Sequence, residues 1–276
     1  MNNEPTVKEH YIPRCYLKQF TINGEQIYQL DLSIGKAIPR PVSIKSICYE
    51  DNLYEFKDES GDFKYRNLIE NKLSIYEREF AKTFYSIRMK ATNGKNFGVL
   101  SFLTSKEKCF LIFFLATMIV RNPDTLQAVT ETTVEYFDSN ISDNRARNLA
   151  IIECLPLYKK LDYKEKNILN SVIKLFENMS FQICVTNKDV IYTSDKPVIL
   201  LGEGIEKIKS VYLPLSPRIF LKMLPYSQTK KECRNRLVAL NDCDVKNINR
   251  MIVSHSKRWV YSKNSFTKKE IKLLIK

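Results

Sequence analysis

Glycine and histidine are scarce in this chain of 276 residues, which has seven glycines and two histidines. The glycines form no phosphate-binding loop, because neither Gly-x4-Gly-Lys-Ser/Thr nor Gly-x-Gly-x2-Gly occurs. Gly-x-Ser-x-Gly and His-Glu-x2-His are also missing, which argues against a serine nucleophile elbow and a zinc protease. Only His10 and His255 can titrate as histidines near neutral pH.

No two of the seven cysteines form a Cys-x2-Cys pair, and their number is odd. Disulfide frameworks and zinc sites are recognised by even numbers or paired spacings, so we expect neither. We assign no metal ligand, and the sequence identifies no cofactor. Scattered cysteines fit a reducing cytosol, and no apolar signal segment follows the polar residues 1–8. The sequence therefore predicts a cytoplasmic protein.

The longest apolar run, Cys109–Val120, has 12 residues. A transmembrane helix needs about 20 residues, so we interpret the run as a helix buried on most sides, with membrane insertion as the minor alternative. Ser105 is the expected N-cap of this helix, and Arg121-Asn122-Pro123 is expected to interrupt it.

Positive charge is in excess and is unevenly distributed. The net charge is +13, and the segment from Arg218 to Lys276 contains 15 Lys and Arg against 4 Asp and Glu, a net charge of +11. This asymmetry predicts an anionic partner, nucleic acid first; the alternative is a solvated basic face. The residues predicted to bind nucleic acid are Arg218, Lys222, Arg234 and Arg258.

Short apolar runs dominate both ends of the chain, whereas the middle has helical periodicity. Residues 1–65 and the segment after 180 contain strand patterns, and residues 67–180 read as helices, among them Arg145–Tyr158 and Tyr163–Asn178. Such segregation predicts an α+β fold. We expect a mixed or antiparallel sheet built from N- and C-terminal segments, within a single domain, 1–276, that carries a helical insertion at roughly 67–180.

His10 and Asp195 are the first candidates for a catalytic site. His10 follows Glu9, so it is a candidate general acid or base positioned by a carboxylate; the alternative is a structural histidine that bonds to the backbone. Asp195 ends a strand pattern in Tyr192–Pro197, where it could orient His10 or hold a cation. The alternative for Ser194 and Asp195 is a local turn bonded to backbone N–H groups.

Arg121 and Asn241 complete the candidate site, each with a structural alternative. Arg121 follows the apolar helix and could clamp an anion, or it could complement the helix dipole. Asn241 reads first as the N-cap of a helix through His255. Glu70 and Glu77 lie two turns apart on one helix, where charged faces are usually solvated.

Four segments resemble the bacterial family known as domain of unknown function 4238 (DUF4238). The opening signature is His10-Tyr-Ile-Pro13 with Tyr16, Leu17 and Phe20. Thr193-Ser-Asp-Lys-Pro-Val198 is similar to a Thr-Ser-Asp-Asn-Pro-Val motif, with Lys196 in place of the usual Asn, and Pro214–Pro217 and Asn241 match further elements. The resemblance implies no established reaction. The resemblance does strengthen His10 and Asp195 as candidate site residues, because both lie in its motifs.

Two hypotheses for the function follow. The first is a nucleic-acid-directed hydrolase, a nuclease-like effector of the toxin or phage-defence kind. In it, His10 is the general acid or base, Asp195 its orienter, Arg121 an electrostatic stabiliser and Asn241 a hydrogen-bond donor. The alternative is a non-catalytic module that binds nucleic acid or an acidic protein, in which His10 and the Ser194-Asp195 turn are structural.

Overall fold

The computed structural model describes residues 5–92, 101–157, 165–203 and 208–274. The chain divides into two compact units, each assembled from three separate segments. Unit 1 comprises Met1–Pro13, Cys48–Phe80 and Leu111–Glu177, and unit 2 comprises Arg14–Ile47, Ala81–Phe110 and Asn178–Lys276. The expectation of a single domain remains a prediction.

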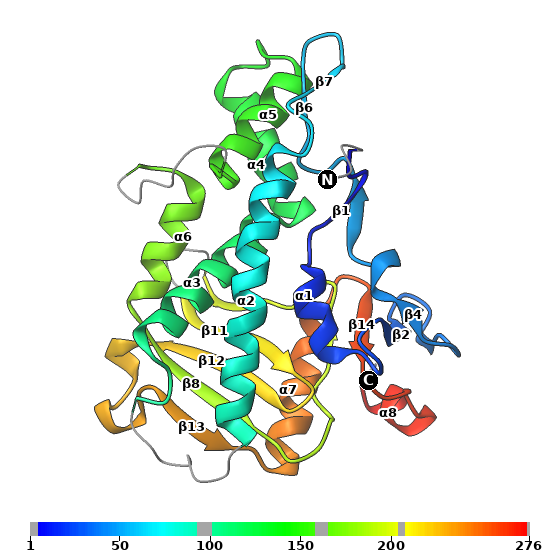
Figure 1. Cartoon of the computed structure of the whole chain (residues 1–276), viewed down its shortest axis with the longest axis vertical. Coiled ribbons are helices and arrows are strands. Elements are labelled where there is room, and N and C mark those ends of the chain that lie inside the picture. The colour runs from blue at the N-terminus through cyan, green and yellow to red at the C-terminus, as the bar shows by residue number, and fades with distance from the viewer. Residues whose placement is uncertain (1–4, 93–100, 158–164, 204–207, 275–276) are drawn as a thin grey trace. The chain divides into compact units, whose positions relative to one another are not determined.

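Unit 1 contains most of the helical section and two short strand pairs (Figure 1). Strand β1 (Lys8–His10) pairs antiparallel with β5 (Tyr49–Asp51), and β6 (Phe56–Lys57) pairs with β7 (Phe63–Lys64). The helices wholly within unit 1 are α4 (Pro123–Tyr136), α5 (Asp143–Cys154) and α6 (Ile168–Glu177). The expected ends of α5 at Tyr158 and of α6 at Tyr163 lie outside the described residues.

Two helices, α2 (Leu68–Thr92) and α3 (Ser105–Val120), are each divided between the units. Asn122 caps α4, because its side chain accepts from the N–H of Asp124 at 2.9 Å, and Pro123 occupies the first turn. The predicted interruption after Val120 is confirmed, with a bend of 63° between α3 and α4. Among the described residues no single helix is long and apolar enough to cross a membrane, although α3 and α4 together meet the length and composition criteria.

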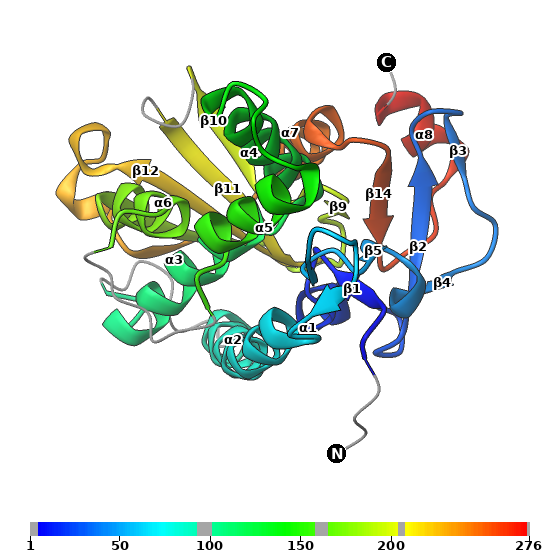
Figure 2. The same ribbon diagram turned by 90° about the horizontal axis from the view of Figure 1, so that it is seen from above.

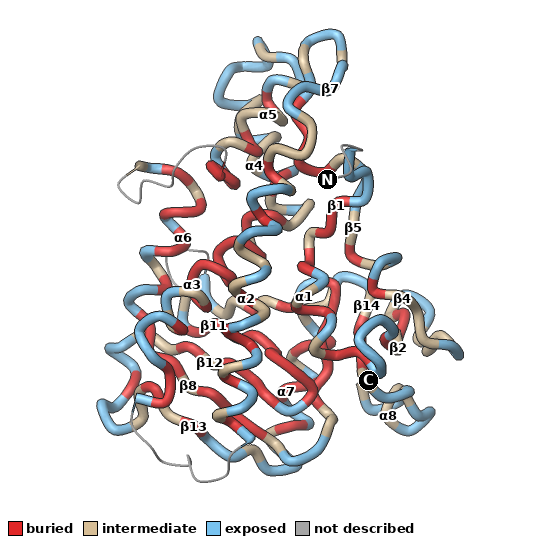
Figure 3. Tube along the Cα trace, viewed as in Figure 1, coloured by how far each residue is buried: buried red, intermediate tan, exposed pale blue. Residues whose placement is uncertain are grey.

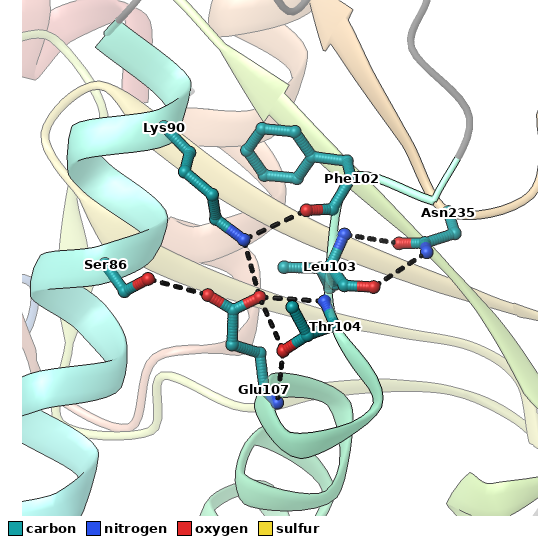
Figure 4. A network of polar contacts seen from close by, with 7 residues as sticks. All are labelled: Ser86, Lys90, Phe102, Leu103, Thr104, Glu107 and Asn235. Carbon is teal, nitrogen blue, oxygen red and sulfur yellow. Dashed lines mark hydrogen bonds and ion pairs between the residues drawn. The ribbon is translucent and has the colours of Figure 1, made fainter.

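The cap of α3 differs from the prediction. Thr104 and Glu107 form a reciprocal capping box: the Thr104 hydroxyl accepts from Glu107 N–H at 3.2 Å, and Glu107 accepts from Thr104 N–H at 2.8 Å (Figure 4). Ser105 is therefore the first helical residue and not the cap. Lys90 and Ser86 of α2 also bind Glu107, at 2.5 and 2.8 Å.

The described part of unit 2 contains two five-stranded sheets. The first, here called the mixed sheet, is antiparallel except for the parallel pair of its last two strands. Its strands in spatial order are β10 (Ile199–Gly202), β11 (Ile208–Ser216), β12 (Ile219–Pro225), β8 (Met179–Val185) and β13 (Arg236–Ala239). Strands β8 and β12 are buried along most of their length, which is typical of a sheet covered on both faces (Figure 3).

The second sheet, here called the terminal sheet, joins the two ends of the chain (Figure 2). Strand β14 lies between β2 and β9, with Trp259 opposite Asp31 and Val260 opposite Ser194. Its strands are β3 (Lys36–Ala37), β2 (Gln26–Asp31), β14 (Trp259–Ser262) and β9 (Thr193–Ser194), with β4 (Val42–Ser43) also paired to β2. The predicted α+β class, with a sheet built from N- and C-terminal segments, is confirmed.

Among the described residues, three α-helices lie wholly within unit 2: α1 (Arg14–Leu17), α7 (Asp242–His255) and α8 (Lys268–Leu274). Helix α7 packs its apolar side into a core shared by both sheets of this unit. That core includes Leu30 and Val260 from the terminal sheet, Phe220 from the mixed sheet, and Ile248 and Ile252 from α7. Ile191 and Tyr192, which precede Asp195 in the chain, belong to the same core.

Candidate functional site

Asp195 lies at the end of β9, and its carboxylate is occupied by the backbone that leads into β14. Oδ1 accepts from Lys257 N–H at 2.9 Å, and Oδ2 accepts from Arg258 N–H at 2.8 Å and Trp259 N–H at 2.9 Å. Burial raises the pKa of Asp195, while these three N–H groups oppose the rise. The side chain is 6% exposed. These contacts give Asp195 a structural task, which is to fix the entry of β14.

Two motifs of the sequence meet where helix α1 contacts strand β9 of the terminal sheet. The hydroxyl of Tyr16, from the opening signature, lies 2.8 Å from that of Thr193, and both side chains are fully buried. Ser194 accepts from Lys196 N–H at 3.2 Å, as the local-turn interpretation predicts. These contacts fix β9 where it enters the sheet.

Asn241 is the N-cap of α7, as the sequence predicts. Its side chain accepts from Asp244 N–H at 2.9 Å, and Asp244 accepts from Asn241 N–H at 3.0 Å, which completes a capping box. The amide oxygen of Asn241 is therefore used by the helix.

His10 and Arg121 belong to unit 1, whereas Asp195 and Asn241 belong to unit 2. His10 is 9% exposed in β1, and its ring lies 5.7 Å from that of Tyr49. Arg121 donates to the carbonyl of His10, so these two predicted site residues are in contact through the backbone. The His10–Asp195 pair itself remains a prediction.

Among the residues that the structure describes, Arg121 is the largest fully buried side chain, with 1% of its surface exposed. Its Nη1 donates to Glu77 at 3.0 Å and its Nε donates to the hydroxyl of Tyr54 at 3.3 Å, while Tyr54 donates to the Arg121 carbonyl at 3.0 Å. A buried cation requires such partners. The sequence predicted that Glu77 lies on a solvated helix face. Its carboxylate is instead the counter-ion of the buried Arg121.

Glu9, which was expected to position His10, has a different environment, and Glu55 is the buried carboxyl that sequence reasoning missed. Adjacent residues of a strand point to opposite faces, and the Glu9 carboxylate accepts from Tyr54 N–H at 2.6 Å rather than orienting His10. Its other oxygen is buried and accepts from no donor in the described part of the chain. Burial, together with the charges of Glu55 and Glu70, raises the pKa of Glu9 to about 8 against the Tyr54 hydrogen bond.

Glu55 is a second buried carboxyl in unit 1, and it is one cause of the raised pKa of Glu9. Glu55 is 5% exposed, accepts from Asn67 N–H at 2.8 Å and lies 3.2 Å from Nε of Arg66. A sequence signal was present, since Glu55 lies inside the apolar run Leu53–Phe56. A buried carboxyl whose pKa is raised to about 8, as that of Glu9 is, is typical of acid–base sites. Within the described residues no three His, Cys, Asp or Glu side chains are arranged to hold a metal ion.

Three of the four basic residues predicted to bind nucleic acid make contacts within unit 2. Arg218 pairs with Asp189 at 2.7 Å, and Arg258 pairs with Asp31 at 2.7 Å, which lowers the pKa of Asp31 to about 2. Arg234 donates to two backbone carbonyls and stacks over a tyrosine ring. Lys222 is half-buried in β12.

The net charges of the two units differ more strongly than those of the segment from Arg218 to Lys276 and the rest of the chain. Unit 2 contains 30 Lys and Arg against 11 Asp and Glu, a net charge of +19, whereas unit 1 contains 14 against 20, a net charge of −6. Internal ion pairs leave these totals unchanged. The basic excess is thus a property of unit 2 as a whole, including its N-terminal and central segments.

A model of the family described as a protein of unknown function, DUF4238, matches residues 8–266. The chain belongs to the DUF4238 family. No match was found among curated proteins or among solved structures. The four segments of this DUF4238 chain that carried the resemblance all fall within the matched range.

Proposed function

We propose that the DUF4238 chain binds nucleic acid through unit 2. The observation that carries the proposal is the net charge of +19 on that unit, whereas the net charge of unit 1 is −6. A surface of one sign attracts a polyanion and gains affinity by releasing its condensed counterions. Lys and Arg side chains at the surface then contact phosphates, whatever the base sequence.

Arginines stacked on aromatic rings add a second feature suited to this partner. The guanidinium of Arg234 lies 4.8 Å from the ring centre of Tyr226, which is 40% exposed, and that of Arg258 lies 4.6 Å from the ring of Trp259. Exposed rings beside cations are the groups on which unpaired bases stack. An arginine stacked on an aromatic ring therefore favours single-stranded over double-stranded nucleic acid as the partner.

The test is the affinity of the whole chain for a labelled single strand, measured by anisotropy at rising salt concentration. We expect the logarithm of the association constant to fall with a slope of about −0.7 per phosphate contacted. Arg234→Ala should weaken binding and reduce the slope. Lys72→Ala, an exposed lysine of unit 1, is the matched control and should change neither.

Two results would count against the proposal. One is no binding at low salt. The other is equal competition by poly-glutamate, which would assign the basic surface to acidic proteins.

The hydrolase hypothesis is our second proposal, and the buried carboxyl of Glu9, next to His10 in β1, favours it. A buried carboxyl with a pKa of about 8 keeps its proton at neutral pH, as a general acid must. We expect His10→Ala to abolish cleavage of a labelled strand while the protein stays folded. A folded His10→Ala protein that cleaves normally would remove His10 from the mechanism.

A further inference from the structure

A pocket of about 330 Å³ opens on unit 2 beside α7 and α8. Its walls come from Lys246 and Arg250 of α7, from the Lys188–Tyr192 segment and from the turn after β14, with Leu273 and Leu274 of α8. Small-molecule pockets span about 300–1,000 Å³. This one is therefore of a size for a ligand no larger than one nucleotide.

Asp189 and Glu270, two of the three acidic residues that line the pocket, are engaged by neighbouring donors. The third, Asp242, is exposed and lies 3.9 Å from Nζ of Lys188. Asp189 pairs with Arg218 at 2.7 Å and with Lys263 at 2.9 Å. Glu270 accepts from Thr267 N–H at 2.8 Å and from the Tyr192 hydroxyl at 3.3 Å. Their negative charges are thus offset or held in place by neighbouring donors.

Two cations that line the pocket, Lys246 and Arg250, are not engaged in this way. Lys246 and Arg250 lie four residues apart on α7, so their side chains share one face of the helix. Both are exposed, and neither has a carboxylate within ion-pair distance among the described residues. Two adjacent cations without counter-ions favour an anion, and an arginine beside a lysine is suited to phosphate.

The lining beside these cations is apolar and ordered. Val245 is 7% exposed, and Tyr192 is 7% exposed with its ring 5.2 Å from that of Phe266. Asn249 holds this wall, because it accepts from Tyr192 N–H at 3.0 Å and donates to the Val190 carbonyl at 2.8 Å. A ligand that joins a phosphate to a flat, partly apolar group matches both halves of the pocket.

We propose that this pocket binds one nucleotide, with its phosphate on Lys246 and Arg250 and its base against the apolar wall. The inference rests on the proposed binding of nucleic acid by unit 2. The nucleotide can be free, or it can be the 5′-phosphorylated end of a bound strand. Both sources present the same phosphate and base.

The experiment compares two 3′-labelled single strands of about twelve nucleotides, identical except for a 5′-phosphate or a 5′-hydroxyl, and adds AMP as a competitor. We expect the 5′-phosphorylated strand to bind about tenfold more tightly, since its phosphate adds charge-assisted hydrogen bonds to Lys246 and Arg250. Arg250→Ala and Lys246→Ala should each remove most of this preference. Arg40→Ala, an exposed arginine of unit 2 outside the pocket, should keep it.

The outcomes separate the two proposals. Salt-dependent binding of both strands, without a phosphate preference and without competition by AMP, overturns the pocket and leaves nucleic-acid binding intact. AMP binding that Arg250→Ala removes, without binding of either strand, supports the pocket with a free nucleotide and overturns the proposed function. A preference that survives both pocket variants assigns the phosphate to another part of unit 2 and overturns the pocket.

Discussion

Replacing Glu9 with glutamine should make the protein more stable at alkaline pH. The Glu9 carboxyl is 1% exposed, and its pKa is raised to about 8 from an ordinary value of 4.5, chiefly by burial. The folded protein therefore holds a proton that the unfolded chain releases above pH 4.5. Stability from this group is complete below pH 4.5 and is lost as the pH rises towards 8.

The magnitude follows from the difference in pKa. One pKa unit corresponds to about 1.36 kcal/mol, so a rise from 4.5 to about 8 corresponds to a loss of up to about 5 kcal/mol across that range. Glutamine does not titrate. Its oxygen can accept from Tyr54 N–H, as the Glu9 carboxyl does.

Urea unfolding at a series of pH values from 5 to 9 measures this effect. Glu9→Gln should match the wild type near pH 5 and exceed it by several kcal/mol near pH 9, because only the wild type loses its proton. Glu50→Gln is the matched control, since Glu50 is the exposed cross-strand partner of Glu9. We expect the control to change stability by less than about 0.5 kcal/mol at every pH. Parallel curves for wild type and Glu9→Gln would refute the reasoning.

Three further predictions concern unit 2. Asp195→Ala leaves three backbone N–H groups without their acceptor and should cost about 2–4 kcal/mol in urea unfolding, whereas an unchanged midpoint would show that β14 does not depend on this carboxylate. Asn241→Ala should cost about 1 kcal/mol through loss of the α7 cap, and Asn241→Ser should recover most of it. Asp31 has a pKa lowered to about 2 by Arg258, so its stabilisation is present above its ordinary value of 3.8 and is lost as the pH falls towards 2. The stability of Asp31→Asn should therefore fall less between pH 4 and pH 2 than that of the wild type. An identical fall would show that the Asp31–Arg258 ion pair does not stabilise the fold.

Local chemistry of the chain accounts for the features that were predicted correctly. The α+β class followed from hydrophobic periodicity, which needs only neighbouring residues. The Asn241 cap and the break before Pro123 depend on contacts within three residues or on one proline ring. The cap of α3 was misplaced by one residue, since both Thr104 and Ser105 can cap a helix and the pairing with Glu107 selects Thr104.

Contacts between distant segments account for the rest. Glu9 meets Tyr54 45 residues away, and the donors to Asp195 lie 62 to 64 residues further along the chain. Such partners have no fixed spacing, because loop closure costs little more for a long loop than for a short one. The charges show the same division: the sequence carries the net +13, and the interleaving of six segments separates it into +19 and −6.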